Sequence, residues 1–224
     1  MIVGERKPIE EIKKMLAPYR KILIAGCGTC VAVCMAGGEK EVGIIAILLR
    51  MAFKMDGKEV EIGEVTVERQ CDKEFIQPLA DKIKEYDVVL STACGVGVQF
   101  MAEHYDTIPV FPALNTKFMG SNEGEGFWKE RCRACNACVL GETGGICPVT
   151  ICAKGLRNGP CGGTNKGKCE VDKEKDCAWT LIYRKCEKLN QLDKIREIFP
   201  PRKYSLQTTP GRMLHEAYLK EEEK

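Results

Sequence analysis

The hydrophobic pattern of the first 120 residues alternates between two periods. Apolar positions recur every three or four residues in four segments, which is typical of helices: Pro8–Tyr19, Glu39–Met55, Lys73–Tyr86 and Val96–His104. Four shorter segments are continuously apolar or alternate, which is typical of strands: Lys21–Ala25, Val60–Glu68, Asp87–Thr92 and Ile108–Phe111. This order predicts an α/β fold with a small parallel, Rossmann- or flavodoxin-like sheet of about four strands.

Two helices have further sequence signals. The segment Glu39–Met55 is apolar on most sides, so we expect a covered helix that ends at Asp56-Gly57. In Lys73–Tyr86 the apolar residues Phe75, Leu79 and Ile83 are expected to face inward.

The pattern changes near residue 120. From Gly120 to Asp176 the chain is rich in Gly, Cys, Lys, Asn and Pro and has almost no periodicity. Such a segment buries too little apolar surface to fold unless metal organises it. After Cys177 the pattern predicts an amphipathic helix, followed by a tail with a short helix near Met213–Leu219. We therefore predict an α/β domain at 1–120 and a cysteine-rich, metal-organised domain with a C-terminal helix at 121–224.

Composition narrows the function classes. The chain has 224 residues, is 44% hydrophobic and carries a net charge of +2, which indicates neither nucleic-acid nor membrane binding. The N-terminus has no secretion signal, and the longest apolar run, Val42–Met51, is too short to span a bilayer. We expect a cytoplasmic protein, in which fourteen cysteines favour metal binding over disulfides.

The first group of cysteines follows predicted strands. Because the carboxyl ends of parallel strands form one edge, thiols placed there should converge: Cys27, Cys30, Cys34, Cys71 and Cys94. Nearby glycines would let the backbone approach a cofactor and donate N–H groups to its sulfurs: Gly26, Gly28, Gly95 and Gly97. Two alternatives remain, ordinary buried cysteines and a nucleotide loop, but GCGTCV lacks the third glycine of GxGxxG.

The second group lies between residues 132 and 177. Its first part, Cys132-x2-Cys135-x2-Cys138-x8-Cys147-Pro148, is close to the bacterial [4Fe–4S] spacing with a longer last gap. Four more cysteines follow at wide gaps, which suit a second cluster or a zinc site: Cys152, Cys161, Cys169 and Cys177. The spacing does not fix which four share a metal. Cys186 is expected in the core, and no catalytic residues are predicted because no nucleophile has a base beside it.

Many of these motifs together resemble one family. The stretches GCGTCVAVC, TVERQC, ACGVGVQ, PALNTKFMG, ERCRACNAC, TGGICPVTICAKGL, NGPCGG, GKCEV and CAW are similar to the MetV-type small iron–sulfur subunit of methylenetetrahydrofolate reductase. The resemblance runs from about Lys21 to Glu187. It implies that the thirteen cysteines named above, other than Cys186, are metal ligands for one to three [4Fe–4S] clusters, with one Zn²⁺ as an alternative in the second region.

The resemblance also implies a role and partners. A MetF-type flavin reductase subunit would carry FAD and the folate chemistry, since a flavin-binding barrel alone needs about 250 residues. This chain would relay electrons between that flavin and ferredoxin or a larger redox complex in one-carbon (acetyl-CoA pathway) metabolism. Two other classes remain: a structural zinc-binding accessory subunit that assembles the flavin subunit, and a free-standing nucleotide-binding oxidoreductase.

Overall fold

A computed structural model describes residues 1–201, 211–213, 215 and 217. The chain divides into two compact units, Met1–Glu130 and Arg131–Lys224. The first unit thus runs ten residues beyond the change in sequence pattern near residue 120. Most of the short helix expected near Met213–Leu219 lies outside the described residues. No helix in the described part of the chain is long and apolar enough to cross a membrane.

A parallel four-stranded sheet forms the centre of the first unit. Its strand order is β3 (Glu61–Val67), β2 (Lys21–Cys27), β4 (Val88–Ser91) and β5 (Val110–Pro112). Every adjacent pair in this sheet is parallel. All four predicted strands are therefore present, and the predicted α/β class is confirmed.

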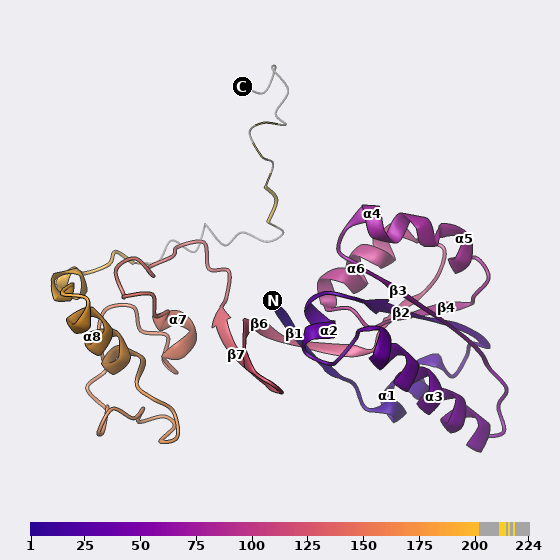
Figure 1. The fold of residues 1–224 in the computed structure, drawn as a ribbon, viewed down its shortest axis with the longest axis horizontal. Helices are drawn as coiled ribbons and strands as arrows, with labels where there is room; N and C mark the ends of the chain where they lie inside the picture. The colour runs from indigo at the N-terminus through magenta and orange to yellow at the C-terminus, as the bar shows by residue number, and fades with distance from the viewer. Residues whose placement is uncertain (202–210, 214, 216, 218–224) are drawn as a thin grey trace. The chain divides into compact units, whose positions relative to one another are not determined.

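Helices cover both faces of this sheet (Figure 1). Ile22 and Ile24 of β2 pack with α1 (Ile9–Leu16) and α3 (Glu39–Met55), whereas Leu23 and Ala25 pack with α6 (Gly95–His104) and the segments before β4. Alternate residues of a strand point to opposite faces, so β2 must be apolar throughout. This is why KILIA reads as a continuous apolar run.

Two predicted helices differ from the expectation. The segment Lys73–Tyr86 is broken into α4 (Lys73–Ile76), the 3₁₀ helix η1 (Gln77–Leu79) and α5 (Ala80–Ile83). Pro78 lies in the middle and has no N–H to continue an α-helix. Its buried residues are Ile76, Leu79 and Ile83, whereas Phe75 is half-buried beside Arg69, whose guanidinium lies 4.8 Å from the ring centre.

Helix α3 has the predicted bounds and ends where expected, at Asp56 and then Gly57, which has φ +69°. It is not covered on all sides by this chain. Val42, Ile45, Leu49 and Phe53 are buried, but Ile47, Met51 and Met55 on the other side are exposed. The expectation of a covered helix is therefore wrong for that face.

The pattern did not predict a second sheet. It has the order β1 (Ile2–Arg6), β6 (Leu114–Gly124) and β7 (Phe127–Cys132), and β1 is antiparallel to β6. Strands β6 and β7 are joined by Glu125-Gly126, and Gly126 has a positive φ of 74°. This hairpin leads directly to the first cysteine of the second region.

The second unit has little regular structure. It contains α7 (Pro148–Ile151), α8 (Ala178–Lys188) and the 3₁₀ helix η2 (Leu192–Arg196). The predicted C-terminal helix is therefore present, but it ends earlier than the pattern indicated because Asn190 adopts φ +53°. The main hydrophobic cluster here is small, with Trp179, Ile182 and Cys186 buried at its centre.

Candidate functional site

Four cysteines of the first unit gather at the carboxyl edge of the parallel sheet. Cys27 is the last residue of β2, Cys71 follows β3, and Cys94 is the N-cap of α6 directly after β4. Cys30 begins the short helix α2 (Cys30–Val33). Partial burial of the Cys71 sulfur raises its pKa, and the neighbouring thiols of Cys27, Cys94 and Cys30 raise it further. The sheet therefore brings these four thiols within electrostatic reach of one another.

Cys34 is placed differently from the other four. It is only 5% exposed, and its sulfur accepts a hydrogen bond from the Gly4 amide at 3.4 Å. The thiol also lies within donating distance of the carbonyl oxygens of Val31, at 3.5 Å, and Gly4, at 3.6 Å. Burial raises the pKa of this thiol, which favours its protonated form. Contacts with β1 thus occupy the Cys34 sulfur.

The four glycines expected beside a cofactor have roles within the chain. The Gly28 amide donates to the Val67 carbonyl at 2.9 Å, and the Gly95 amide donates to the Thr116 hydroxyl at 2.8 Å. A Cβ on Gly97 would lie 2.7 Å from the Ala93 Cβ, and one on Gly26 would lie 2.8 Å from a Val42 methyl. Close packing of the chain therefore requires Gly26 and Gly97.

The loop from Cys132 to Cys138 has an unusual backbone. Ala134 has φ +48° and Asn136 has φ +54°, so left-handed residues alternate with the cysteines. The Ala134 amide donates to the Cys132 sulfur at 3.3 Å. Turns that contain left-handed residues can direct backbone N–H groups to one side and make a concavity for anions, which many iron–sulfur sites use. The backbone here suits a group with anionic sulfur atoms.

Cys147 is held near the start of that loop. It is the N-cap of α7, in which Pro148 and Val149 are buried. The Thr150 hydroxyl donates to the Arg131 carbonyl at 3.3 Å, which ties α7 to the residue before Cys132. This contact associates Cys147 with the loop that carries Cys132, Cys135 and Cys138.

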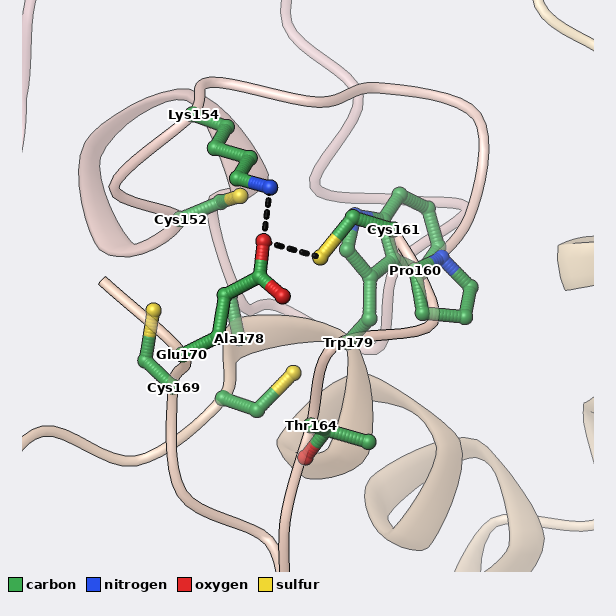
Figure 2. A pocket seen from close by; sticks show the side chains of 10 residues that line it. Cys152, Lys154, Pro160, Cys161, Thr164, Cys169, Glu170, Ala178 and Trp179 are labelled. Carbon is green, nitrogen blue, oxygen red and sulfur yellow. Dashed lines mark hydrogen bonds and ion pairs between the residues drawn. The ribbon is translucent and has the colours of Figure 1, made fainter. Parts of the chain in front are cut away.

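The remaining four cysteines of the segment line one small pocket (Figure 2). They are Cys152, Cys161, Cys169 and Cys177. Two backbone bonds hold the last two in place, from the Cys169 amide to Lys175 at 2.9 Å and from the Cys177 amide to Gly167 at 2.8 Å. The structure thereby separates these four from the CxxCxxC loop, which sequence spacing could not do.

An ion pair also lies in this pocket, between Lys154 and Glu170. Figure 2 shows Lys154 and Cys161 both directed towards one carboxylate oxygen of Glu170, with the Cys161 sulfur 3.7 Å away. The hydrogen bond from Lys154 lowers the pKa of Glu170, and the same bond raises the pKa of Lys154. The pocket therefore holds a carboxylate and a compensating cation beside its thiols. Sequence analysis missed both residues, although Glu170 directly follows a cysteine.

The surroundings of Cys177 favour its thiolate form. Burial raises its pKa, but hydrogen bonds from the Thr180 amide and hydroxyl and from Thr164 outweigh burial, so the pKa lies below its ordinary value. The residue is also the N-cap of α8, where the helix dipole favours a thiolate. A thiolate is the form that binds metal.

The cysteines of the described residues form neither disulfides nor a compact site for a single ion. Within the described residues, no three His, Cys, Asp or Glu side chains are close enough together to hold an ion. None of the fourteen cysteines, all of which are described, forms a disulfide. The donor set nevertheless fits soft thiophilic metals, because the pocket is lined by four thiols and thiolates prefer iron–sulfur clusters and zinc.

Cys186 behaves as predicted from the helical pattern. It is fully buried on α8 with Trp179 and Ile182. A cysteine in this position acts as a small hydrophobic residue.

Comparisons with known proteins concern the C-terminal half of the chain. Searches of curated proteins and of solved structures gave no match. One family model matches, and its matched region contains the hairpin β6–β7, the CxxCxxC loop and the four-cysteine pocket. Residues 111–205 match the family described as methylene-tetrahydrofolate reductase C terminal, which associates this part of the chain with that reductase.

Proposed function

We propose that this chain is a cytoplasmic iron–sulfur electron-transfer subunit of methylenetetrahydrofolate reductase. It would exchange electrons with the FAD of a separate MetF-type subunit and with ferredoxin or a larger redox complex in one-carbon metabolism. The family match supports the association with the reductase. The sheet of the first unit has four parallel strands rather than the eight of a flavin-binding barrel, which is consistent with flavin on a partner subunit.

The observation that carries the proposal is the pocket lined by four thiols, and the proposal adds two further sets of four, one from the carboxyl edge of the sheet and one from the loop before α7. The groups are Cys27, Cys30, Cys71 and Cys94; Cys132, Cys135, Cys138 and Cys147; and Cys152, Cys161, Cys169 and Cys177. Four thiolates are the ligand set of a [4Fe–4S] cluster. Several such centres in one small chain suit electron relay better than a single structural ion.

The roles of the residues follow from their surroundings. Iron–sulfur clusters, when bound, supply one-electron transfer. The loop at residues 132–138 would donate backbone N–H groups to sulfur, as the Ala134 amide does to Cys132, and such bonds tune cluster potentials. Lys154 would offset the negative charge of thiolates at the pocket, since it pairs with the same Glu170 oxygen that the Cys161 sulfur approaches.

Anaerobic purification of the full chain tests this function. We expect a brown protein with equimolar iron and acid-labile sulfide, and paramagnetic resonance signals of reduced clusters after treatment with dithionite. Addition of reduced chain to a FAD-loaded MetF-type subunit should reduce the flavin. A colourless protein that contains only zinc would refute the proposal.

A structural zinc site remains a second candidate for the four-cysteine pocket. The small cluster around Trp179 gives this unit little buried apolar surface, so a metal would have to contribute to its folding. The wide gaps between the four cysteines also suit a zinc site. One zinc per chain, together with iron bound elsewhere, would support this assignment. If removal of zinc exposes the four pocket cysteines to alkylation but the second unit stays folded, the zinc is not needed for folding and the assignment is contradicted.

A further inference from the structure

A buried glutamine lies behind the cysteines at the sheet edge. Gln70 is 0% exposed and comes directly before Cys71. Its side-chain amide donates to the carbonyl oxygens of Ala25 at 2.8 Å and Gly26 at 3.0 Å. Its amide oxygen accepts a hydrogen bond from the Ser91 hydroxyl at 2.6 Å. The side chain therefore uses both of its donors and its acceptor inside the protein.

The groups joined by this bridge share one property. Gly26 precedes Cys27, Gln70 precedes Cys71, and the Ser91 oxygen accepts the amide of Ala93, which precedes Cys94, at 3.2 Å. These positions lie at or within three residues of the ends of three strands, β2, β3 and β4. One side chain thus connects the three segments immediately before three of the four edge thiols.

A second bridge extends this frame to the segment that carries Cys30. The Thr92 hydroxyl donates to the Gly37 carbonyl at 2.7 Å, and the Cys27 amide donates to the same carbonyl at 3.0 Å. Gly37 ends the loop after α2. Both Thr92 and Gln70 are fully buried, so neither bridge competes with water.

The surrounding packing is shaped to the glutamine. A Cβ on Gly97 would lie 3.0 Å from the Gln70 Cβ, closer than ordinary contacts allow. Gly97 on α6 thus leaves room for Gln70 between the helix and the sheet. A buried amide is costly unless its hydrogen bonds are made, and an apolar residue would serve a simple core equally well. The polar bridge therefore indicates a need for fixed geometry.

We propose that Gln70, held by Ser91, is a positioning residue that sets the spacing of Cys27, Cys71 and Cys94 for metal binding. This inference rests on the proposed function, because it assumes that these thiols share a metal. Gln70 touches no metal itself. It acts by holding the peptide groups on which the ligand side chains are mounted, as outer residues of metal sites commonly do.

Residue-resolved alkylation of the full chain tests this role. The metal-free protein is titrated with Cd²⁺, and mass spectrometry records protection of each cysteine from iodoacetamide. In Gln70→Met, which keeps the side-chain length but removes the bridge, half-protection of Cys71 and Cys94 should need about 10–100-fold more Cd²⁺. Protection of Cys161 and Cys169 in the other unit should not change. Ser91→Ala gives a milder variant that keeps Gln70, with a smaller shift in the same direction.

Thr143→Val is the matched control. Thr143 is fully buried in the second unit and donates to the Val139 carbonyl at 2.8 Å, so the variant loses a buried hydrogen bond far from the edge thiols in sequence. It should leave the Cd²⁺ midpoint of Cys71 unchanged. A lower melting temperature with an unchanged Cys71 midpoint in both test variants would overturn the positioning role alone. Absence of Cys71 protection in the unaltered chain would overturn the edge metal site and the positioning role together.

Discussion

Cys34 provides a sharp test of how the structure divides the edge cysteines. It has helical spacing from Cys30, yet its sulfur contacts β1 and is 5% exposed. Cys71, by contrast, is an exposed residue whose sulfur lies near three other thiols. We therefore predict that Cys34→Ala lowers the stability of the protein but retains metal at the sheet edge. Cys71→Ala should leave the stability unchanged but lose metal there.

The size of the stability effect follows from the contacts that Cys34→Ala removes. The substitution deletes a buried sulfur and leaves the Gly4 amide without that acceptor. An unsatisfied buried donor costs about 1–3 kcal/mol, and loss of the sulfur's packing keeps the expected cost in the upper part of that range. For a chain of this size, about 2–4 °C of melting temperature corresponds to each kcal/mol, so a cost of about 2–3 kcal/mol lowers the melting temperature by about 4–12 °C.

Two measurements on the same samples decide the question. Thermal unfolding of the metal-free proteins gives the stability difference, and Cd²⁺ protection of Cys94 gives metal binding at the edge. Cys34→Ala should have a lower melting temperature but the same Cd²⁺ protection of Cys94 as the unaltered chain. Cys71→Ala should have an unchanged melting temperature but lose the protection of Cys94. If Cys34→Ala instead abolishes protection without a change in melting, Cys34 is a ligand and the division is wrong.

Three further predictions concern other parts of the chain. Two backbone amides lower the pKa of Asp87, so its contribution to stability is present above the ordinary pKa of about 4 and is lost as pH falls through the lower folded value. In urea unfolding at a series of pH values, Asp87→Asn should therefore reduce the fall in the free energy of unfolding at acid pH, and an unchanged fall would contradict this. Trp179→Phe removes the indole bond to the Leu156 carbonyl, at 2.9 Å, and should cost about 0.5–1.5 kcal/mol in chemical unfolding, whereas no loss would show that water replaces the bond. Gly163→Ala places a Cβ where the Glu170 side chain lies and should weaken Cd²⁺ protection of Cys161, unlike Gly141→Ala, which has open space around it and no positive φ.

The sequence pattern predicted the parallel sheet because burial on both faces leaves an unmistakable apolar run. In β2, Ile22 and Ile24 face one layer of helices and Leu23 the other, so no polar residue interrupts the strand. The hairpin β6–β7 gave no such signal. Its residues are largely Asn, Thr, Lys, Ser, Glu and Gly, and it is anchored by widely spaced apolar residues such as Phe118 and Trp128. Pairing with β1, more than 100 residues earlier in the chain, stabilises a segment whose local pattern favours a loop.

The edge cysteines could be predicted as a group because topology alone brings strand ends together. Their individual roles could not, since helical spacing puts Cys30 and Cys34 in related positions but does not reveal that the Gly4 amide of β1 bonds to the Cys34 sulfur. The same limit applies between residues 132 and 177. Spacing leaves eight thiols interchangeable, whereas left-handed turns at Ala134 and Asn136 and the loops around Lys154 distribute them over two places.

The buried polar residues behind the thiols could not be predicted from the sequence, although the structure shows their contacts clearly. Gln70 lies in the stretch TVERQC, but nothing in the sequence links it to Ser91, 21 residues later. Only the folded sheet brings the Gln70 amide oxygen and the Ser91 hydroxyl to 2.6 Å. Cys27, Cys34 and Cys186 are all buried. Cys27 ends β2 at the edge of the sheet, whereas the Cys34 sulfur contacts Gly4 of β1 and Cys186 packs with Trp179 and Ile182, so these contacts set two of the fourteen cysteines apart from the rest. The twelve that remain are the number that three four-thiolate sites require. Metal content of the Cys34→Ala and Cys186→Ala variants should therefore equal that of the unaltered chain, whereas replacement of any one of the twelve should reduce it.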